Sequence, residues 1–106
     1  MDFFEKQPRE VLDYDVDARE WFKSIPDDDI QSVNITVTSE SENPPALELG
    51  PTVHPEHVLI GAEPKEFKIW LGGGTDGEQY LVTCVISTEQ DRQFEHEFLV
   101  IVRDER

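Results

Sequence analysis

Residues 67–88 read Phe67-Lys-Ile-Trp-Leu-Gly-Gly-Gly-Thr-Asp-Gly-Glu-Gln-Tyr-Leu-Val-Thr-Cys-Val-Ile-Ser-Thr88, and four of the six glycines of the chain fall within this stretch. Glycine adopts positive φ without a Cβ clash, so these glycines can close a turn between two runs rich in β-branched and aromatic residues. The pattern predicts a β-hairpin whose arms are residues 66–71 and 80–87. It predicts a fold class before it predicts any chemistry.

Alternating hydrophobicity on both sides of this stretch predicts further strands. The clearest is 11–17, where Leu12, Tyr14 and Val16 share one face and three aspartates share the other. Residues 30–38 follow the same pattern, whereas 39–64 hold five of the seven prolines and can form only short edge strands, at 46–49 and 57–60. Residues 93–103 form the last predicted strand, with a bulge or two-sided burial near Leu99.

The segment between the first two of these strands is predicted to be irregular. Residues 18–24 are expected to form one helical turn that brings Trp21 to the core, and it ends before Pro26 because a residue preceding proline avoids the α region. Asp27, Asp28 and Asp29 are expected to lie in an exposed loop.

About seven short strands at nearly even spacing are typical of an antiparallel β-sandwich, with a small barrel as the alternative. We therefore expect an all-β fold with a single sandwich domain over residues 11–106 and an N-terminal arm over 1–10, which contains Pro8. Tyr80 begins a strand and so resembles the tyrosine-corner residue of immunoglobulin-like domains. Cys84, the only cysteine, has no disulfide partner, so a disulfide-free relative of those domains is expected.

The charge of the chain restricts its partners. With 24 acidic and 9 basic residues the formal net charge is −15, which disfavours binding to nucleic acid or to an anionic membrane. The acidity is either a solubility device or a surface for basic partners. No signal peptide and no long apolar run are present, and the single cysteine fits a reducing compartment, so the expected location is cytoplasmic or a virion assembled inside a cell.

No motif for catalysis, cofactor or metal stands out. The Gly72–Gly77 loop lacks the lysine of a phosphate-binding loop and precedes a strand where that motif needs a helix. Cys84 shares its face with apolar residues and is expected to be a buried thiol. His54 and His57 could suggest zinc, but Pro55 between them opposes the helix that would bring them together. We expect no enzyme, no cofactor and no metal.

Two blocks of the sequence resemble a known family. They are Leu12-Asp-Tyr-Asp-Val-Asp-Ala-Arg-Glu-Trp-Phe followed by residues 29–33, and Ile69-Trp-Leu-Gly-Gly-Gly-Thr-Asp-Gly-Glu-Gln-Tyr-Leu-Val-Thr-Cys-Val-Ile-Ser-Thr followed by Arg92 and residues 97–102. Together they are similar to small virion proteins of tailed bacteriophages, described as fibre-tail adaptor or neck-associated proteins. The resemblance covers about half of the chain.

This resemblance implies an immunoglobulin-like sandwich in the phage tail or neck. Such a protein is expected to bridge a tail or connector ring to fibres or neighbouring rings, in multiple copies within a symmetric assembly and without catalytic residues. Loops and termini of a rigid scaffold usually make such contacts. The contact residues expected here are Phe3, Phe4 and the loop residues Gly73, Gly74, Thr75 and Asp76.

Two other functions remain open at the level of sequence. The acidity also suits a cytoplasmic inhibitor, or a DNA mimic, that occupies a basic groove of another protein. A carbohydrate-binding sandwich would need exposed aromatic side chains, for which Trp21 and Trp70 are the candidates.

Overall fold

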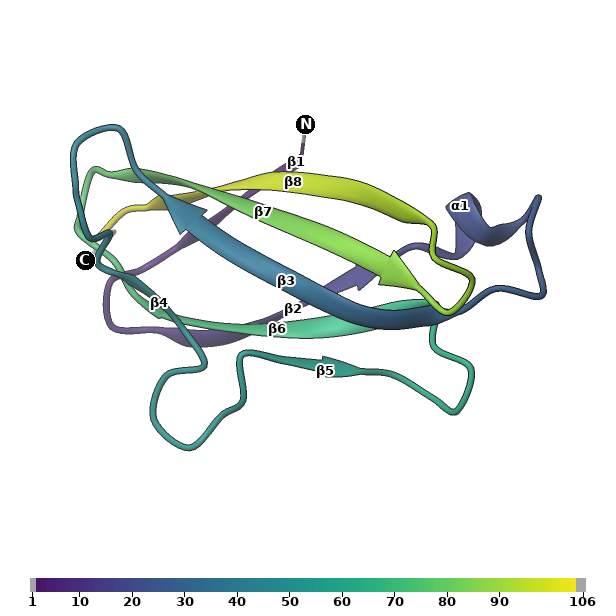
Figure 1. The fold of residues 1–106 in the computed structure, drawn as a ribbon. Helices are drawn as coiled ribbons and strands as arrows, with labels where there is room; N and C mark the ends of the chain where they lie inside the picture. Colours follow the sequence, from purple (N-terminus) through teal and green to yellow (C-terminus); the bar gives the residue numbers. More distant parts are fainter. Residues whose placement is uncertain (1, 105–106) are drawn as a thin grey trace.

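The computed structural model describes residues 2–104, which form two β-sheets packed face to face and one short helix (Figure 1). The elements in chain order are β1 (Asp2–Lys6), β2 (Val11–Asp17), α1 (Arg19–Phe22), β3 (Ile30–Thr38), β4 (Leu47–Leu49), β5 (His57–Leu59), β6 (Glu66–Gly73), β7 (Gln79–Thr88) and β8 (Gln93–Val102). The molecule is elongated along its strands, with extents of 46 × 27 × 22 Å.

The order of the strands identifies the sandwich. Sheet I has the order β1-β8-β7-β3, and sheet II has the order β2-β6-β4, with β5 also paired to β6. All pairs are antiparallel except β1 with β8. The neighbours β3-β7-β8 and β2-β6-β4 correspond to the C-F-G and B-E-D strands of immunoglobulin-like domains. The predicted all-β sandwich is confirmed.

The core lies between the two sheets and is built from alternate residues of each strand. Side chains of β6 and β7 that share the predicted inward parity are fully buried, as are alternate residues near the end of β8. These residues are Phe67, Ile69, Leu71, Tyr80, Val82, Cys84, Ile86, Phe98, Val100 and Val102. Burying one large apolar side chain contributes about 1.5–3 kcal/mol, so this alternation favours one register strongly.

The predicted hairpin of residues 67–88 is wrong. β6 lies in sheet II and β7 in sheet I, so the connection between them crosses from one sheet to the other. Gly73, Gly74 and Gly77 have φ values of 70°, 99° and 88°, as expected of turn glycines. Glycine signals where the chain reverses. Both strands bury a complete apolar face, and stacking lets those faces meet, whereas pairing in one sheet would place them side by side.

The predicted N-terminal arm also needs correction. Residues 2–6 form β1, which pairs in parallel with β8 from Asp2–Phe98 to Lys6–Val102. Lys6 is only 2% exposed, and its ammonium donates to the Gly73 carbonyl at 2.6 Å. β1 was not predicted because it is short, and because its partner, β8, is the strand most distant from it in the sequence.

The helical turn α1 lies where it was expected but buries a different residue. Phe22 is 1% exposed and belongs to the core, whereas Trp21 is 36% exposed. Neighbouring residues of a helix point about 100° apart, so only one of these two can face the core. Trp21 instead stacks on Phe94 of β8, with ring centroids 3.8 Å apart.

No bulge interrupts β8. Its pairing with β7 is continuous from Gln79–Ile101 to Ser87–Gln93, and Leu99 is half-buried on the outer face of sheet I, opposite Leu81. The outer face, and not an irregular backbone, therefore accounts for the apolar residues of both parities in this strand.

Candidate functional site

A cluster of hydrogen bonds around Tyr80 holds the crossing between β6 and β7. The Tyr80 hydroxyl accepts the Thr75 backbone N–H at 2.9 Å and donates to Glu42 Oε1 at 2.6 Å. The Thr75 hydroxyl donates to the second oxygen of Glu42, also at 2.6 Å. The bond from the tyrosine hydroxyl to backbone a few residues upstream is the tyrosine corner that the position of Tyr80 suggested.

The hydrogen bonds and burial in this cluster favour an ionised Glu42 and a protonated Tyr80. Hydrogen bonds from Thr75 and Tyr80 hold the pKa of Glu42 below its usual range, because they stabilise the carboxylate. Burial raises the pKa of Tyr80, and donation to Glu42 raises it further. An ionised Glu42 therefore faces a protonated Tyr80 at neutral pH. Glu42 lies in the proline-rich loop after β3, where no local sequence signal pointed to it.

The predicted contact loop divides into two parts. Gly73 and Gly74 are half-buried and form the crossing itself, whereas Thr75 and Asp76 are exposed. A Cβ added to Gly74 would lie 2.6 Å from Val102 Cγ2, so this position requires glycine on steric as well as conformational grounds. The Asp76 carboxylate accepts the Asp104 backbone N–H at 2.9 Å. Thr75 and Asp76 are thus exposed but held in place.

Phe3 and Phe4 point in opposite directions because successive side chains of a strand alternate. Phe4 is half-buried between the sheets and stacks on Tyr14, with ring centroids 4.5 Å apart. Phe3 is on the outer face of sheet I and is 62% exposed. Of these two phenylalanines, Phe3 is therefore the one whose ring is mainly exposed to solvent.

Phe3 lies at one end of an apolar row that crosses the outer face of sheet I. In the register of the sheet, Phe3 pairs with Leu99, Leu99 with Leu81, and Leu81 with Thr38 of β3. We call Phe3, Leu99 and Leu81 the outer row. At the β3 end the row borders an open groove of about 700 Å³, lined by Thr38, Ser39, Glu40, Ser41, Gly77, Glu78, Gln79, Leu81 and Leu99.

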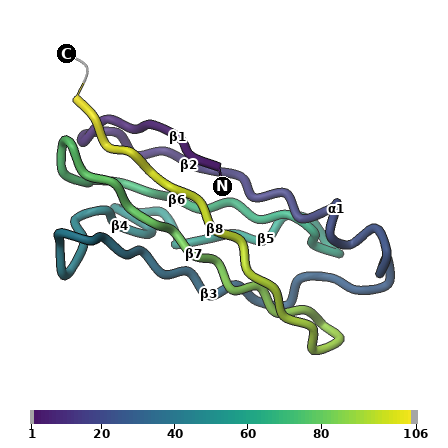
Figure 2. The backbone as a smooth tube through the Cα atoms, turned by 90° about the horizontal axis from the view of Figure 1, so that it is seen from above, coloured from purple at the N-terminus to yellow at the C-terminus, as the bar shows by residue number. Residues whose placement is uncertain are grey.

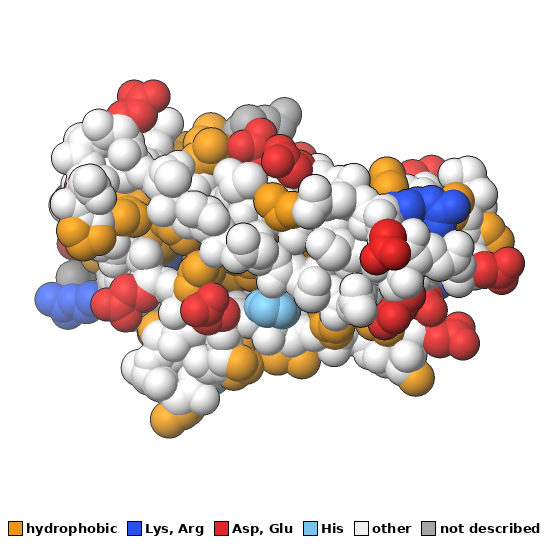
Figure 3. All heavy atoms as spheres, viewed as in Figure 1, with side chains coloured by type: hydrophobic (Ala, Val, Ile, Leu, Met, Phe, Trp, Pro, Cys, Tyr) orange, Lys and Arg blue, Asp and Glu red, His pale blue; other side chains and the backbone are white. Residues whose placement is uncertain are grey.

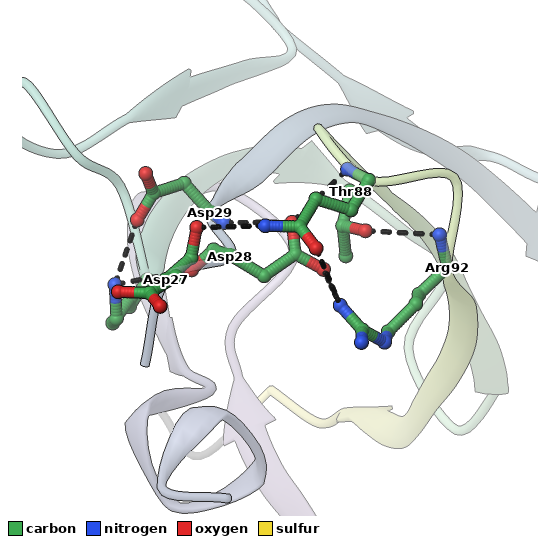
Figure 4. Close-up of polar contacts among 7 residues, drawn as sticks. Asp27, Asp28, Asp29, Thr88 and Arg92 are labelled. Atoms are coloured by element: carbon green, nitrogen blue, oxygen red, sulfur yellow. Dashed lines mark hydrogen bonds and ion pairs between the residues drawn. The ribbon is translucent and has the colours of Figure 1, made fainter. Parts of the chain in front are cut away.

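A second cluster, at the opposite end of the sandwich, centres on Asp28 (Figure 4). This side chain is fully buried, contrary to the expected exposed loop. Its carboxylate contacts the Arg92 guanidinium at 2.8 Å and accepts the backbone N–H groups of Asp29 and Gln90 at 3.0 and 3.1 Å. Asp28 thereby ties the loop before β3 to the turn between β7 and β8.

The state of Asp28 follows from competing effects. Burial alone would raise the pKa of its carboxyl, but hydrogen bonds from Thr88, Arg92 and two backbone N–H groups outweigh burial and hold that pKa below its usual value. Asp28 is therefore a carboxylate at neutral pH with its acceptor sites occupied by this chain. It serves structure and is not free for a ligand.

The residues considered for chemistry do not assemble into a reactive site. Cys84 is buried in the core, and burial raises the pKa of its thiol to about 12, which leaves almost no nucleophilic thiolate at neutral pH. Among residues 2–104, no three His, Cys, Asp or Glu side chains gather in a way that could hold a metal ion. His54 stacks on Trp70, with ring centroids 3.7 Å apart.

Both tryptophans considered for sugar binding have one ring face covered. His54 covers Trp70 and Phe94 covers Trp21. These two stacks lie on different sheets, since Trp70 belongs to β6 and Phe94 to β8. They do not form one aromatic platform.

The single helix of the described chain, α1, has four residues, and no helix there is long and apolar enough to cross a membrane. No curated protein matches the sequence. A protein-family model does match, over residues 6–101, which run from the end of β1 nearly to the end of β8. The family is described as podophage GP4 fiber-tail adaptor protein gp77, and the chain belongs to this family.

Proposed function

We propose that this chain is a structural adaptor of a podophage virion that joins a tail or connector ring to a fibre. The observation that carries the proposal is the family match over both sheets of the sandwich. The same sequence also folds around networks whose polar groups are used internally, as at Glu42 and Asp28. Such a protein acts by binding and not by catalysis.

The proposed contacts lie on the outer face of sheet I and at the β6–β7 crossing. Phe3 supplies an exposed aromatic side chain, and Thr75 and Asp76 supply polar groups on a loop that is already ordered. A contact surface ordered before binding loses less conformational entropy on association. Each copy can therefore bind modestly while several copies in a symmetric ring attach a fibre firmly.

The test is the composition of purified particles. We expect mass spectrometry to find the chain in virions, and electron microscopy to show tails without fibres in particles made when its gene is deleted. Complementation with the unaltered gene should restore the fibres. The proposal fails if the chain is abundant in infected cells but missing from particles, an outcome that would favour a cytoplasmic inhibitor. It also fails if particles without the chain carry normal fibres.

A further inference from the structure

Strand β3 is an edge of sheet I, and apart from the Ile30 N–H, which donates to the Pro64 carbonyl at 2.8 Å, no backbone bond within residues 2–104 reaches its outer side. It bonds to β7 on one side only, and β1 and β3 lie at opposite margins of the molecule (Figure 2). An unpaired strand edge presents a row of backbone N–H and C=O groups that can bind another extended chain.

The hydrogen bonds between β7 and β8 determine which backbone groups of β7 face β3. Thr88 N–H donates to the Arg92 carbonyl at one end of this pair, and Val102 N–H donates to the Glu78 carbonyl at the other. In the alternating pattern of antiparallel pairs, these bonds place the odd-numbered residues of β7 in positions that do not bond to β8. The N–H and C=O groups of those odd-numbered residues consequently face β3.

The register then identifies the free groups of β3. Ser32, Asn34, Thr36 and Thr38 are the residues of β3 that pair with odd-numbered residues of β7. The residues between them, Val33, Ile35 and Val37, therefore direct their backbone N–H and C=O groups away from the sheet. Among residues 2–104, no hydrogen bond outside the strand ladder reaches these groups.

The other edge strands carry features that oppose pairing. β2 has three aspartates on its outer face, of which Asp13 and Asp15 contact Lys68. β4 and β5 have three residues each and follow proline-containing loops, and β1 has five residues, two of them acidic and one a lysine. Short length, charge and proline are the usual means of blocking an edge. β3 has nine residues and none of these features along its length, and its one irregularity is a register shift between Ile30 and Ser32 at its start.

β3 also lies in a stretch of the sequence that has no charged side chains. Residues 30–39 and 79–88 are the two longest runs without a charged side chain in a protein of net charge −15. The second run is β7, which is covered by strands on both sides. In Figure 3 the middle of the band over β3 is mainly white and orange, and red side chains lie toward its ends and below it. Loss of charge at the centre of a surface is typical of interfaces.

The two ends of β3 are acidic. Asp27 precedes the strand, and Glu40 and Glu78 line the groove at its far end. No ion pair within residues 2–104 involves these three carboxylates. A partner strand with lysine or arginine at both ends would pair with them.

We propose that the free edge of β3 binds an extended segment of another virion protein, uncharged at its centre and basic at both ends, which adds a fifth strand to the four of sheet I. This inference rests on the proposed adaptor role and names one surface that the role would use. A second copy of this chain is the less suitable occupant. Both ends of β3 are acidic, so either orientation of a β3–β3 pair places carboxylates beside carboxylates.

Amide hydrogen exchange of the isotope-labelled chain, followed by NMR, tests the pairing directly. The probe is a synthetic peptide of alternating threonine and valine residues with lysines at both ends. At a peptide concentration of ten times Kd, we expect the exchange of Val33, Ile35 and Val37 amides to slow by about tenfold. The amides of Asn34 and Thr36 already bond to β7 and supply the internal control, because they should change little.

Two altered peptides separate charge from backbone pairing. A peptide with glutamates in place of the lysines should not protect these amides, because its ends would face Asp27 and Glu40. A lysine-ended peptide that is N-methylated at every threonine and valine keeps its charge but loses the backbone donors of both edges, and it should also fail. Equal protection by all three peptides would overturn the proposal.

A matched pair of variants at Val37 tests the same edge from the side of the protein. Val37→Pro removes an outward N–H that makes no bond to β7, and edge strands accept proline at such positions. Val37→Ala loses the same half-buried side chain but keeps the N–H. We expect the peptide to bind Val37→Pro about tenfold more weakly than Val37→Ala. If Val37→Pro does not fold, the N-methylated peptide still decides the question.

The remaining outcomes each overturn the proposal in a recognisable way. Slower amide exchange in β1 or β2 on addition of the peptide would show that the peptide pairs with an edge other than β3. Protection of β3 that rises with concentration of the chain alone, together with a dimer in sedimentation, would identify a second copy as the occupant. No protection would show that the edge does not pair. None of these results affects the detection of the chain in virions, so failure here is distinct from failure of the adaptor role.

Discussion

Single carboxylates connect segments of this chain that lie far apart in the sequence. Glu42 receives hydroxyl groups from Thr75 and Tyr80, and Asp28 receives a guanidinium and backbone donors from the β7–β8 turn. The two clusters lie at opposite ends of the sandwich and fix loops that the core alone does not hold. Removing one partner of such a cluster leaves the groups that bonded to it without that hydrogen bond, and this costs more than the net free energy of the bond.

Tyr80→Phe tests the first cluster. The change deletes one hydroxyl and leaves both the Thr75 N–H and a Glu42 oxygen without that partner, so we expect the free energy of unfolding to fall by about 1–2 kcal/mol. Urea denaturation followed by tryptophan fluorescence measures it. Tyr14→Phe is the matched control, because no hydrogen bond of the Tyr14 hydroxyl is present within residues 2–104, and it should stay within about 0.5 kcal/mol. Equal losses in both variants would contradict the role of the corner.

Asp28→Asn tests the second cluster and carries a pH dependence. The native state holds the pKa of Asp28 below its unfolded value, so its contribution to stability is present at neutral pH and is lost as the pH falls below about 4. We expect the variant to melt roughly 10 °C lower than the unaltered chain at pH 7. The difference should narrow as the pH falls below that range and the native carboxylate gains its proton. Asp27→Asn, at an exposed neighbour, should show neither effect.

At the level of elements, the crossing between β6 and β7 and the strand β1 decide how the two sheets join. The crossing needs positive φ at Gly73, Gly74 and Gly77, and β1 places Lys6 against the Gly73 carbonyl. The N-terminal strand thus supports the connection between the sheets as well as extending sheet I.

Gly74→Ala should destabilise the crossing by about 1–3 kcal/mol, because alanine at φ 99° is strained and its Cβ would meet Val102. Gly77→Ala is the matched control. It has φ 88° but open space around the added Cβ, so it carries the backbone strain alone. Thermal denaturation should place Gly74→Ala below Gly77→Ala. The reverse order would show that packing against Val102 does not matter.

Phe3 and Phe4 of β1 should respond in opposite ways. Phe4→Ala removes a half-buried ring from its stack with Tyr14, and we expect a loss of about 2 kcal/mol in unfolding free energy. Phe3→Ala removes an exposed ring and should change stability by less than about 0.5 kcal/mol. In particles, Phe3→Ala should weaken incorporation of the chain or its fibre. Normal incorporation would remove Phe3 from the proposed contact surface.

The predictability of these elements depended on how local their signals are. The alternation of Val11–Asp17 and the run Ile30–Thr38 predicted the bounds of β2 and β3, because burial of one strand face leaves a period of two in the sequence. Positive φ was predicted correctly for three of the four clustered glycines and wrongly for Gly72, which lies within β6. Positive φ alone does not decide whether the joined strands pair or stack.

The missed features were contacts between distant residues. β1 pairs with a strand at the far end of the chain, and Glu42 meets Tyr80 38 positions away. Asp28 is buried against Arg92 and Thr88, which belong to another turn. A run of three aspartates gives no sign of such a contact. Thr75 and Asp76 of the predicted contact loop are exposed. Hydrogen bonds with the Tyr80 hydroxyl and the Asp104 backbone N–H hold these two residues in place.

At the level of the whole molecule, a net charge of −15 acts on a small sandwich. Like charges repel one another within the fold, and salt screens them within a Debye length of about 10 Å at 0.1 M. The same charge attracts a basic partner.

Salt should therefore move stability and association in opposite directions. Raising sodium chloride from about 0.05 to 0.5 M should raise the melting temperature of the isolated chain by a few degrees and weaken binding of the lysine-ended peptide by about tenfold. Calorimetry and fluorescence anisotropy measure the two quantities. A peptide affinity that is independent of salt would show that the acidic ends of β3 do not take part.

The parallel pairing of β1 with β8 has a mechanical consequence. Force applied at Asp2 pulls β1 along its own axis, and opposite force applied at Arg103 pulls β8 along the same axis in the other direction. The load then falls on all the ladder bonds of this pair together, in shear, whereas an antiparallel pair pulled at its open end would separate one bond at a time. A domain loaded in this direction resists extension until several bonds break at once.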